Sequence, residues 1–381
     1  MMSLKCLSDD IKQELTLSPP WQKEDFILHT KFKLKSLNNE EKENNWNKLS
    51  DEIIIAIFNW LPKTFLCKIS LVCHRFYILS HDESLWQSID LSNKKLSIST
   101  IIHLIHVGLK IIKLSHTEIT EKIDYLPLLN QEIFVNTNKI NKITHLDLSF
   151  SSISSKILNN ILENQISITH LSLEDLKLDE EITNLYTKYN LQILNLSRCQ
   201  NLSFNIIQRI LLASDRIVEL NLAWTNLNTE DLQNICRYLP KSLIKLNLSG
   251  NRETLNDEDI KVITENCINI QELDLSDCNQ LSDSSIVYIT KNLQNLKILA
   301  LSRCYKIDPN IFLQLKVLTK LKYLDIFNLL NQTGVHQLKE ALIKFGLCIE
   351  INYNYFSTIA RPTTGINRTT IWKKRTRDLI C

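Results

Sequence analysis

Leu243-Ile-Lys-Leu246-Asn-Leu248 is one copy of a pattern, L-x-x-L-x-L, that recurs from about Leu109 to Ile351. The last apolar residues of eight clear copies follow one another after 25, 23, 26, 26, 27, 26 and 25 residues. These copies are Ile143–Leu148, Ile168–Leu173, Leu191–Leu196, Ile217–Leu222, Leu243–Leu248, Ile270–Leu275, Leu296–Leu301 and Leu321–Ile326. Self-similarity at this period is the signature of a leucine-rich-repeat solenoid.

The repeat length predicts an α/β fold. A strand needs only five or six residues, so a unit of about 26 residues leaves room for a helix on the opposite face. Successive strands then lie parallel on the inside of a horseshoe, joined by right-handed crossovers. We expect about ten repeats over residues 89–352, with an extra loop of roughly eight residues near 125–141. Helix N-caps are expected at Asn228, Asn256, Ser282 and Asp308.

The composition argues against several classes of function. With 44 basic and 42 acidic residues the formal net charge is +2, which gives no reason to expect a nucleic-acid partner. No apolar run approaches the length of about 18 residues that a membrane span needs. The five glycines are scattered, and neither a metal-ligand pair nor a G-x-S-x-G sequence occurs. We therefore expect no cofactor, no metal and no catalytic residue.

The ten cysteines also bear on the compartment. Because no apolar secretory signal is seen, we expect reduced thiols in the cytosol or nucleus. Cys199, Cys278 and Cys304 each lie three residues past the last leucine of a repeat, at its buried Asn/Cys position. Packing is therefore the role we expect for them.

The first 88 residues differ from the repeats. Residues 1–45 lack sustained periodicity, so we expect a mobile arm there. Residues 46–88 predict a small all-α module, because two acidic residues precede an apolar run, Ile53–Leu61, that Pro62 ends. About 40 residues cannot bury so much apolar surface by themselves. The excess indicates either a docking site for another protein or a cap over the open end of the solenoid.

The sequence of this module resembles an F-box. The residues at the family's spacing are Trp46-x-x-Leu49-x-x-Glu52, Ile57-Phe58-x-x-Leu61, Leu66, Val72-Cys73 and Asp82-Glu83-Ser84-Leu85-Trp86. In that family the module binds the small adaptor that links it to a cullin scaffold. The residues that the resemblance implies to face the adaptor are Trp46, Leu49, Phe58, Lys68 and Phe76. Departures at Ser50, Phe65 and Phe76, where the family has proline, an acidic residue and tryptophan, should weaken or reshape these contacts.

The concave face of the predicted horseshoe is a second candidate surface. Alternate side chains of a strand point to opposite faces, so residues between the leucines should face the concave side. The residues between the last two leucines form a polar column: Asp147, Ser172, Asn195, Asn221, Asn247, Asp274, Ala300 and Asp325. The column two residues beyond the last leucine reads Phe150, Asp175, Arg198, Trp224, Gly250, Asp277 and Arg303. Tryptophan beside arginine and aspartate is typical of an interface hot spot; the alternative is a solvated edge with Trp224 covered by the chain's own tail.

Three further motifs are similar to the family of S-phase kinase-associated protein 2: Asp82–Gln87, Leu299–Tyr305 and Phe356–Thr363. The resemblance, which runs from Trp46 to the C-terminus, implies the non-catalytic substrate-recognition subunit of a cullin-RING ubiquitin ligase of the SCF type. In that family the concave face and a returning tail, here residues 353–381, hold a small cyclin-kinase regulatory subunit. Together they recognise a phosphorylated cyclin-dependent kinase inhibitor.

The positions that match the family's partner and substrate pocket are Trp224, Arg252, Asp277 and Arg303, with Tyr355 standing where the family has histidine. The short basic run 373–377 favours nuclear import or a solvated terminus, and we expect the chain in the nucleus and the cytoplasm. The alternative function is that of a leucine-rich-repeat interaction scaffold without a ubiquitin role, its N-terminal module only capping the array.

Overall fold

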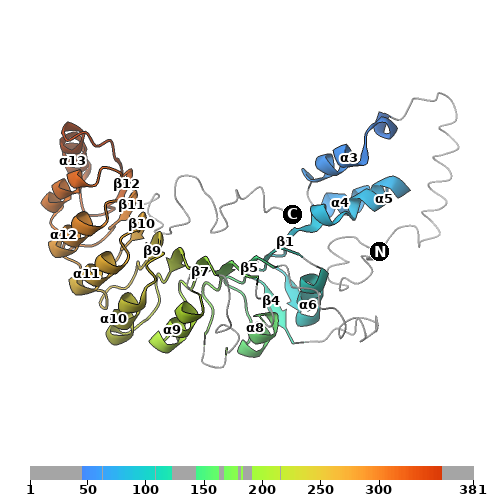
Figure 1. Ribbon diagram of the computed structural model, residues 1–381, viewed down its shortest axis with the longest axis horizontal. Helices are drawn as coiled ribbons and strands as arrows, with labels where there is room; N and C mark the ends of the chain where they lie inside the picture. The colour runs from blue at the N-terminus through green and yellow to red at the C-terminus, as the bar shows by residue number, and fades with distance from the viewer. Residues whose placement is uncertain are drawn as a thin grey trace.

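The computed structural model describes residues 45–61, 63–107, 109–121, 143–162, 167–178, 182, 191–214 and 216–353. Within them the chain forms a curved array of strand-and-helix repeats with a small helical module at its N-terminal end (Figure 1). The expected arm (1–45), the insertion near 125–141 and the tail (353–381) with Tyr355 lie almost wholly outside the described residues.

Eleven parallel strands form one sheet along the inside of the curve (Figure 1). They are β1 (Ser88–Asp90), β3 (Ile111–Lys113), β5 (His145–Asp147), β6 (His170–Ser172), β7 (Ile193–Asn195), β8 (Glu219–Asn221), β9 (Lys245–Asn247), β10 (Glu272–Asp274), β11 (Ile298–Ala300), β12 (Tyr323–Asp325) and β13 (Glu350–Asn352). Two more strands, β2 (Lys95–Ser97) and β4 (Glu118–Thr120), pair in parallel beside them. The predicted α/β solenoid is confirmed.

Helices cover the outer face of the sheet (Figure 1). They are α6 (Ile98–Val107), α8 (Ser155–Leu162), α9 (Phe204–Ala213), α10 (Thr229–Tyr238), α11 (Asp257–Asn266), α12 (Asp283–Asn292), η6 (Pro309–Val317) and α13 (Gln332–Lys344). All four predicted N-caps accept a hydrogen bond from a backbone N–H of the first helical turn. Asn256 does more, because its own backbone N–H donates to the Asp259 carboxylate at 3.0 Å and completes a capping box.

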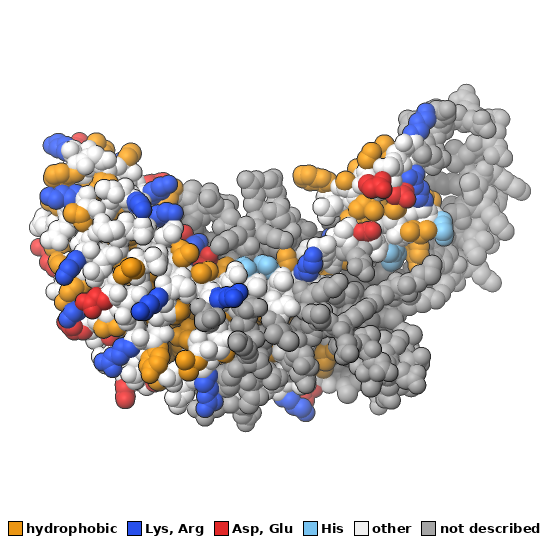
Figure 2. Space-filling model, viewed as in Figure 1, with side chains coloured by type: hydrophobic (Ala, Val, Ile, Leu, Met, Phe, Trp, Pro, Cys, Tyr) orange, Lys and Arg blue, Asp and Glu red, His pale blue; other side chains and the backbone are white. Residues whose placement is uncertain are grey.

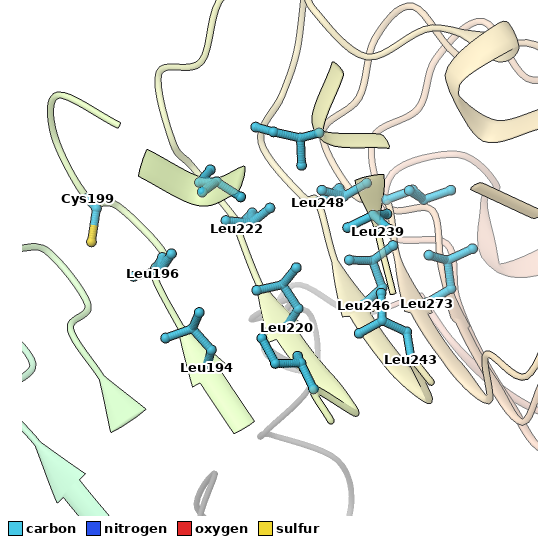
Figure 3. Packing of buried hydrophobic residues seen from close by; sticks show 14 of the residues in the cluster. Leu194, Leu196, Cys199, Leu220, Leu222, Leu239, Leu243, Leu246, Leu248 and Leu273 are labelled. Atoms are coloured by element: carbon cyan, nitrogen blue, oxygen red, sulfur yellow. The ribbon is translucent and has the colours of Figure 1, made fainter. Parts of the chain in front are cut away.

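The repeated leucines stack between sheet and helices (Figure 3). The strands pair in register, so Leu220 lies beside Leu246, and Leu246 beside Leu273. All three are buried. Each contributes roughly 1.5–3 kcal/mol through burial of its side chain. Cys199, Cys278 and Cys304 extend this packing, and the thiol of each donates to a carbonyl of the preceding repeat.

The polar column on the strands is buried except at the half-buried Asp325, contrary to the expectation that it would be available on the concave surface. Asn247 is fully buried and Asp274 is 6% exposed. In each case Oδ1 accepts a hydrogen bond from the backbone N–H two residues later, from Ser249 at 2.9 Å and from Ser276 at 3.0 Å. The same bond recurs at Asp147, Asn195 and Asn221. These five side chains therefore hold the turns after β5, β7, β8, β9 and β10 and are not a contact surface.

The N-terminal module contains η3 (Asn45–Lys48), α3 (Asp51–Phe58), α4 (Lys63–Ile69), α5 (His74–Ser80) and η4 (Glu83–Trp86). Its first α-helix includes the two acidic residues and ends three residues before the predicted end at Leu61. Its core, formed by Ile54, Phe58, Leu66, Leu79 and Leu85, is separate from the core of the solenoid. In the described part of the chain, no helix combines the length and apolarity needed to cross a bilayer.

Candidate functional site

Three aromatic side chains form a ladder in the N-terminal module. Phe76 on α5 meets Trp46 edge to face at a ring-centroid distance of 5.4 Å, and meets Phe58 in the same way at 5.3 Å. Trp46 is 41% exposed, whereas Phe58 is 1% exposed. Of the predicted adaptor-facing residues, Phe58 therefore supports the ladder from within the core, and Trp46 forms its outer end.

Arg75 fixes the segment that carries Trp46. Its guanidinium donates to the Trp46 carbonyl at 3.0 Å and to the Leu49 carbonyl at 2.6 Å. It also pairs with the Asp51 carboxylate, with Nε 2.8 Å from Oδ1. Leu49 is half-buried against the core of the module. Sequence reasoning missed Arg75, because its contacts lie 24 to 29 residues away in the chain.

The outer surface of this module is apolar over a wide area. Large apolar side chains that stay exposed are Trp46, Ile53, Ile57, Trp60, Phe65, Val72 and Ile78. Trp60, which follows α3, is the most exposed of them at 89%. Figure 2 shows these apolar patches beside charged side chains on the module. Lys68 is exposed as well. An exposed apolar surface of this kind is typical of a protein-binding site.

The second site lies at the carboxyl ends of the strands, where the sequence predicted a hot spot. Arg303 donates from Nε to Asp277 Oδ1 at 2.7 Å, and a second hydrogen bond joins its Nη2 to Asp277 Oδ2. The Arg252 guanidinium lies 3.9 Å from the same carboxylate and 5.2 Å from the centroid of the Trp224 ring. The structure thus brings Trp224, Arg252, Asp277 and Arg303 together.

The members of this pocket differ in accessibility. The Asp277 side chain is 6% exposed and the Arg303 side chain 25%, so this pair forms the floor. Arg252 is 55% exposed at its side chain, and Trp224 is 39% exposed. A guanidinium over an indole face is a favourable contact that still leaves donors for an acidic partner. The sequence reasoning missed Phe327, whose ring centroid lies 5.6 Å from the Arg303 guanidinium and adds a second aromatic contact to the pocket.

The buried thiols Cys199, Cys267 and Cys304 of the repeats are poor nucleophiles. Burial raises the pKa of Cys199 to about 12, that of Cys304 to about 12 and that of Cys267 to about 11. These thiols therefore stay protonated at neutral pH, and the thiolate is the reactive form. Among the described residues, no group of three or more His, Cys, Asp or Glu side chains is placed to hold a metal ion.

Fold and site together define a leucine-rich-repeat protein that carries an F-box at its N-terminal end. The F-box-like family model matches residues 46–92, and the model described as the SKP2 LRR domain matches residues 99–379. Because the second match covers well over half of the chain, the chain belongs to the SKP2 leucine-rich-repeat family. The two domains together support an F-box substrate receptor of an SCF-type ubiquitin ligase, and the F-box indicates a Skp1-type adaptor as partner.

Solved structures that the chain resembles include the complex of Rad7 and Elc1 from yeast and the leucine-rich-repeat protein LegL7 from Legionella pneumophila. The first match is 16% identical, covers 84% of this chain and 90% of that chain, and has a TM-score of 0.44. The second is 19% identical, covers 52% of this chain and 80% of that chain, and has a TM-score of 0.33.

Proposed function

We propose that the chain is the non-catalytic substrate-recognition subunit of a cullin-RING ubiquitin ligase of the SCF type. The F-box binds the adaptor and, through it, the cullin-RING scaffold. The repeats bind phosphorylated cell-cycle regulators such as cyclin-dependent kinase inhibitors, together with a small cyclin-kinase regulatory subunit. The ligase works in the nucleus and the cytoplasm. The observation that carries this proposal is an F-box with a core of its own and an apolar outer surface, attached to a solenoid with a preformed polar-aromatic pocket.

The separate core of the F-box argues against a mere cap. A cap over the solenoid would merge its apolar residues with the leucines of the first repeats. Instead, Ile54, Phe58 and Leu66 form their own cluster, while Ile53 and Ile57 on the same helix remain exposed. Two apolar faces on one helix are useful only if a second polypeptide covers the outer one. This favours the ubiquitin-ligase receptor over the interaction scaffold without a ubiquitin role.

The pocket supports capture of a protein partner. Trp224 and Arg252 form an exposed pair of the residue types that dominate binding hot spots. They stand on the pair formed by the buried Asp277 and the half-buried Arg303, which keeps the pocket in one shape before binding. A rigid solenoid between adaptor and substrate then acts by proximity, because a tethered lysine meets the activated ubiquitin at a high effective concentration.

The adaptor half of the proposal is tested with the full chain co-expressed with a Skp1-type adaptor and its cullin. Trp46→Ala combined with Phe76→Ala removes the outer part of the aromatic ladder and should reduce co-purification of both partners at least tenfold. Leu212→Ala removes an apolar side chain of α9 that is even more exposed than Trp46, and it should leave co-purification of both partners unchanged. If the double variant co-purifies as much adaptor as the wild type, the module is not the adaptor site.

A further inference from the structure

The turn after each strand of the sheet from β1 to β12 contains one residue in the left-handed backbone region. In five successive repeats, from His116 to Trp224, this residue is bulky or charged. His116 and Phe150 both have φ 57°, Asp175 has φ 63° and Arg198 has φ 60°. Glycine adopts this conformation without the steric penalty that side chains meet. Gly250 takes the equivalent position after β9, with φ 83°, so the fold accepts glycine there. His116, Phe150 and Arg198 are therefore less favourable there than glycine, as are Trp224 and Arg303 of the candidate pocket. This part of the rim shares the strained backbone of the pocket, which is consistent with a role outside folding.

The rim cluster is defined here as His116, Phe150, Asp175 and Arg198. These four residues hold one another in place on the surface. The imidazole of His116 stacks on the Phe150 ring with centroids 4.7 Å apart and an interplanar angle of 4°. The Arg198 guanidinium lies 5.8 Å from the Phe150 centroid. Its Nε is 3.4 Å from Asp175 Oδ1. His116 is exposed, and so is about half of the Arg198 side chain, so the cluster is both ordered and accessible.

The rim cluster is continuous with the pocket. Phe150 follows β5 and Trp224 follows β8, and three neighbouring strand pairs separate them. At about 4.8 Å per strand spacing, the two aromatic residues stand roughly 14 Å apart. An extended peptide advances about 3.3 Å per residue, and its alternate side chains share one face. Side chains i and i+4 of such a peptide therefore reach both aromatics. Side chain i+2, about 6.6 Å along the peptide, meets the Arg198 guanidinium, which reaches back to within 5.8 Å of the Phe150 centroid.

Arg198 is suited to a carboxylate, and a phosphate has no advantage over a carboxylate there. Arg198 contacts Asp175 through one long hydrogen bond, whereas Arg303 contacts Asp277 through two. The Arg198 guanidinium can therefore donate hydrogen bonds to a second acidic group. The nearby Asp175 carboxylate, 37% exposed, already balances its charge. A phosphate with nearly two charges would be attracted about twice as strongly by Arg198 and repelled about twice as strongly by Asp175, so its extra charge gains nothing at this pair.

We propose that the rim from Phe150 to Trp224 binds an extended peptide of the captured protein with the pattern apolar-x-acidic-x-apolar, the acidic residue being Asp or Glu. One apolar side chain packs against Phe150 and His116, and the other against Trp224. The carboxylate between them binds Arg198. Assigning the peptide to the captured protein rests on the proposed function, but the recognition itself needs neither adaptor nor cullin.

The test uses the purified full chain alone and a fluorescent nine-residue peptide, Ser-Gly-Leu-Ser-Glu-Ser-Leu-Gly-Ser, in a polarisation titration. Saturable binding is expected. Replacing Glu by Gln in the peptide, or Arg198→Gln in the protein, should weaken binding at least tenfold, whereas Arg237→Gln on α10 should leave it unchanged. A peptide with phosphoserine in place of Glu should bind no more tightly. Absence of saturable binding, tighter binding of the phosphopeptide, or indifference to Arg198→Gln would overturn the proposal.

Phe150→Gly separates recognition from folding. Glycine relieves the left-handed backbone, so the melting temperature should rise or stay equal while peptide binding falls at least tenfold. A variant that loses stability and binding together would instead assign Phe150 to the fold and overturn its role here. Because cullin and adaptor are absent from both measurements, failure of the peptide site leaves the co-purification result for the F-box untouched, and the reverse also holds.

Discussion

The Trp224 ring rests directly on Gly250. A Cβ built on Gly250 would lie 2.4 Å from Cδ2 of the indole, closer than any side chain tolerates. Gly250 also has φ 83°, which favours glycine for a second reason. The Trp224 indole can therefore take its position in the candidate pocket only because residue 250 of the next repeat has no side chain.

Gly250→Ala should displace Trp224 and reduce capture of the cyclin-kinase regulatory subunit at least tenfold in a pull-down with the full chain. The matched control is Gly346→Ala, since Gly346 has the same φ of 83° but nothing within 4 Å of its added Cβ. Both variants should lose about 1 kcal/mol of stability from the left-handed backbone. Only the first should lose the partner; equal capture by both would contradict the positioning role.

Arg303→Ala should lower stability as well as binding. Asp277 is 6% exposed, and without Arg303 its nearest cation is Arg252 at 3.9 Å. Leaving the buried Asp277 carboxylate without its main hydrogen-bond partner costs on the order of 1–3 kcal/mol. Urea unfolding measures this loss. Adding Asp277→Asn removes the orphaned charge and should recover part of that loss. If Arg303→Ala unfolds at the same urea concentration as the wild type, the buried Asp277 carboxylate does not need Arg303 to balance its charge.

The repeats could be predicted from the sequence because their signal is local and periodic. The pattern L-x-x-L-x-L, repeated every 23 to 27 residues, is compatible with one architecture, the leucine-rich-repeat solenoid. Strand alternation also gave the correct face for the column that contains Asn247 and Asp274. Strand alternation could not show that this column is buried, because burial depends on how the repeats stack in register. It also depends on the hydrogen bonds that these side chains accept from backbone N–H groups of the turns.

The sites could be predicted only in part. Trp224, Arg252, Asp277 and Arg303 were singled out and are close together, but Gly250 beneath Trp224 carries no local signal of a contact 26 residues away. Phe58 is different, because Ile54 and Phe58 lie four residues apart on one helix and both are buried. That spacing indicates a core face and could have separated Phe58 from the surface positions.

Arg75→Met should weaken adaptor binding at least tenfold in a calorimetric titration, without changing the unfolding of the repeats. The reason is that Arg75 holds the Trp46 and Leu49 carbonyls and thereby the outer aromatic residue. Asp51→Asn is the control, since the Arg75–Asp51 pair is exposed at 34% and 56% and such pairs contribute about 0–1 kcal/mol. If both variants weaken adaptor binding equally, the Arg75–Asp51 ion pair, and not the bonds to the carbonyls, positions Trp46.

Asp274 should make the solenoid more stable in mild acid than at pH 8. Burial raises the pKa of this carboxyl from 3.8 to about 7, with Asp325 and Asp277 adding repulsion. Between these values the folded state binds a proton that the unfolded state does not, so stability falls as pH rises from about 4 to 7 and then levels off. Asn195, Asn221 and Asn247 make the same turn bond in other repeats without a charge.

Asp274→Asn should therefore keep the bond to the Ser276 N–H and raise stability at pH 8 by about 1–3 kcal/mol, with little change at pH 4. Urea unfolding at a series of pH values measures the difference between variant and wild type. The converse variant, Asn247→Asp, places a carboxyl at a fully buried position of the neighbouring repeat and should lower stability at pH 8 more than at pH 4. Parallel pH profiles for wild type and Asp274→Asn would mean that Asp274 is ionised in the folded chain throughout this range, and that burial is not what controls its titration.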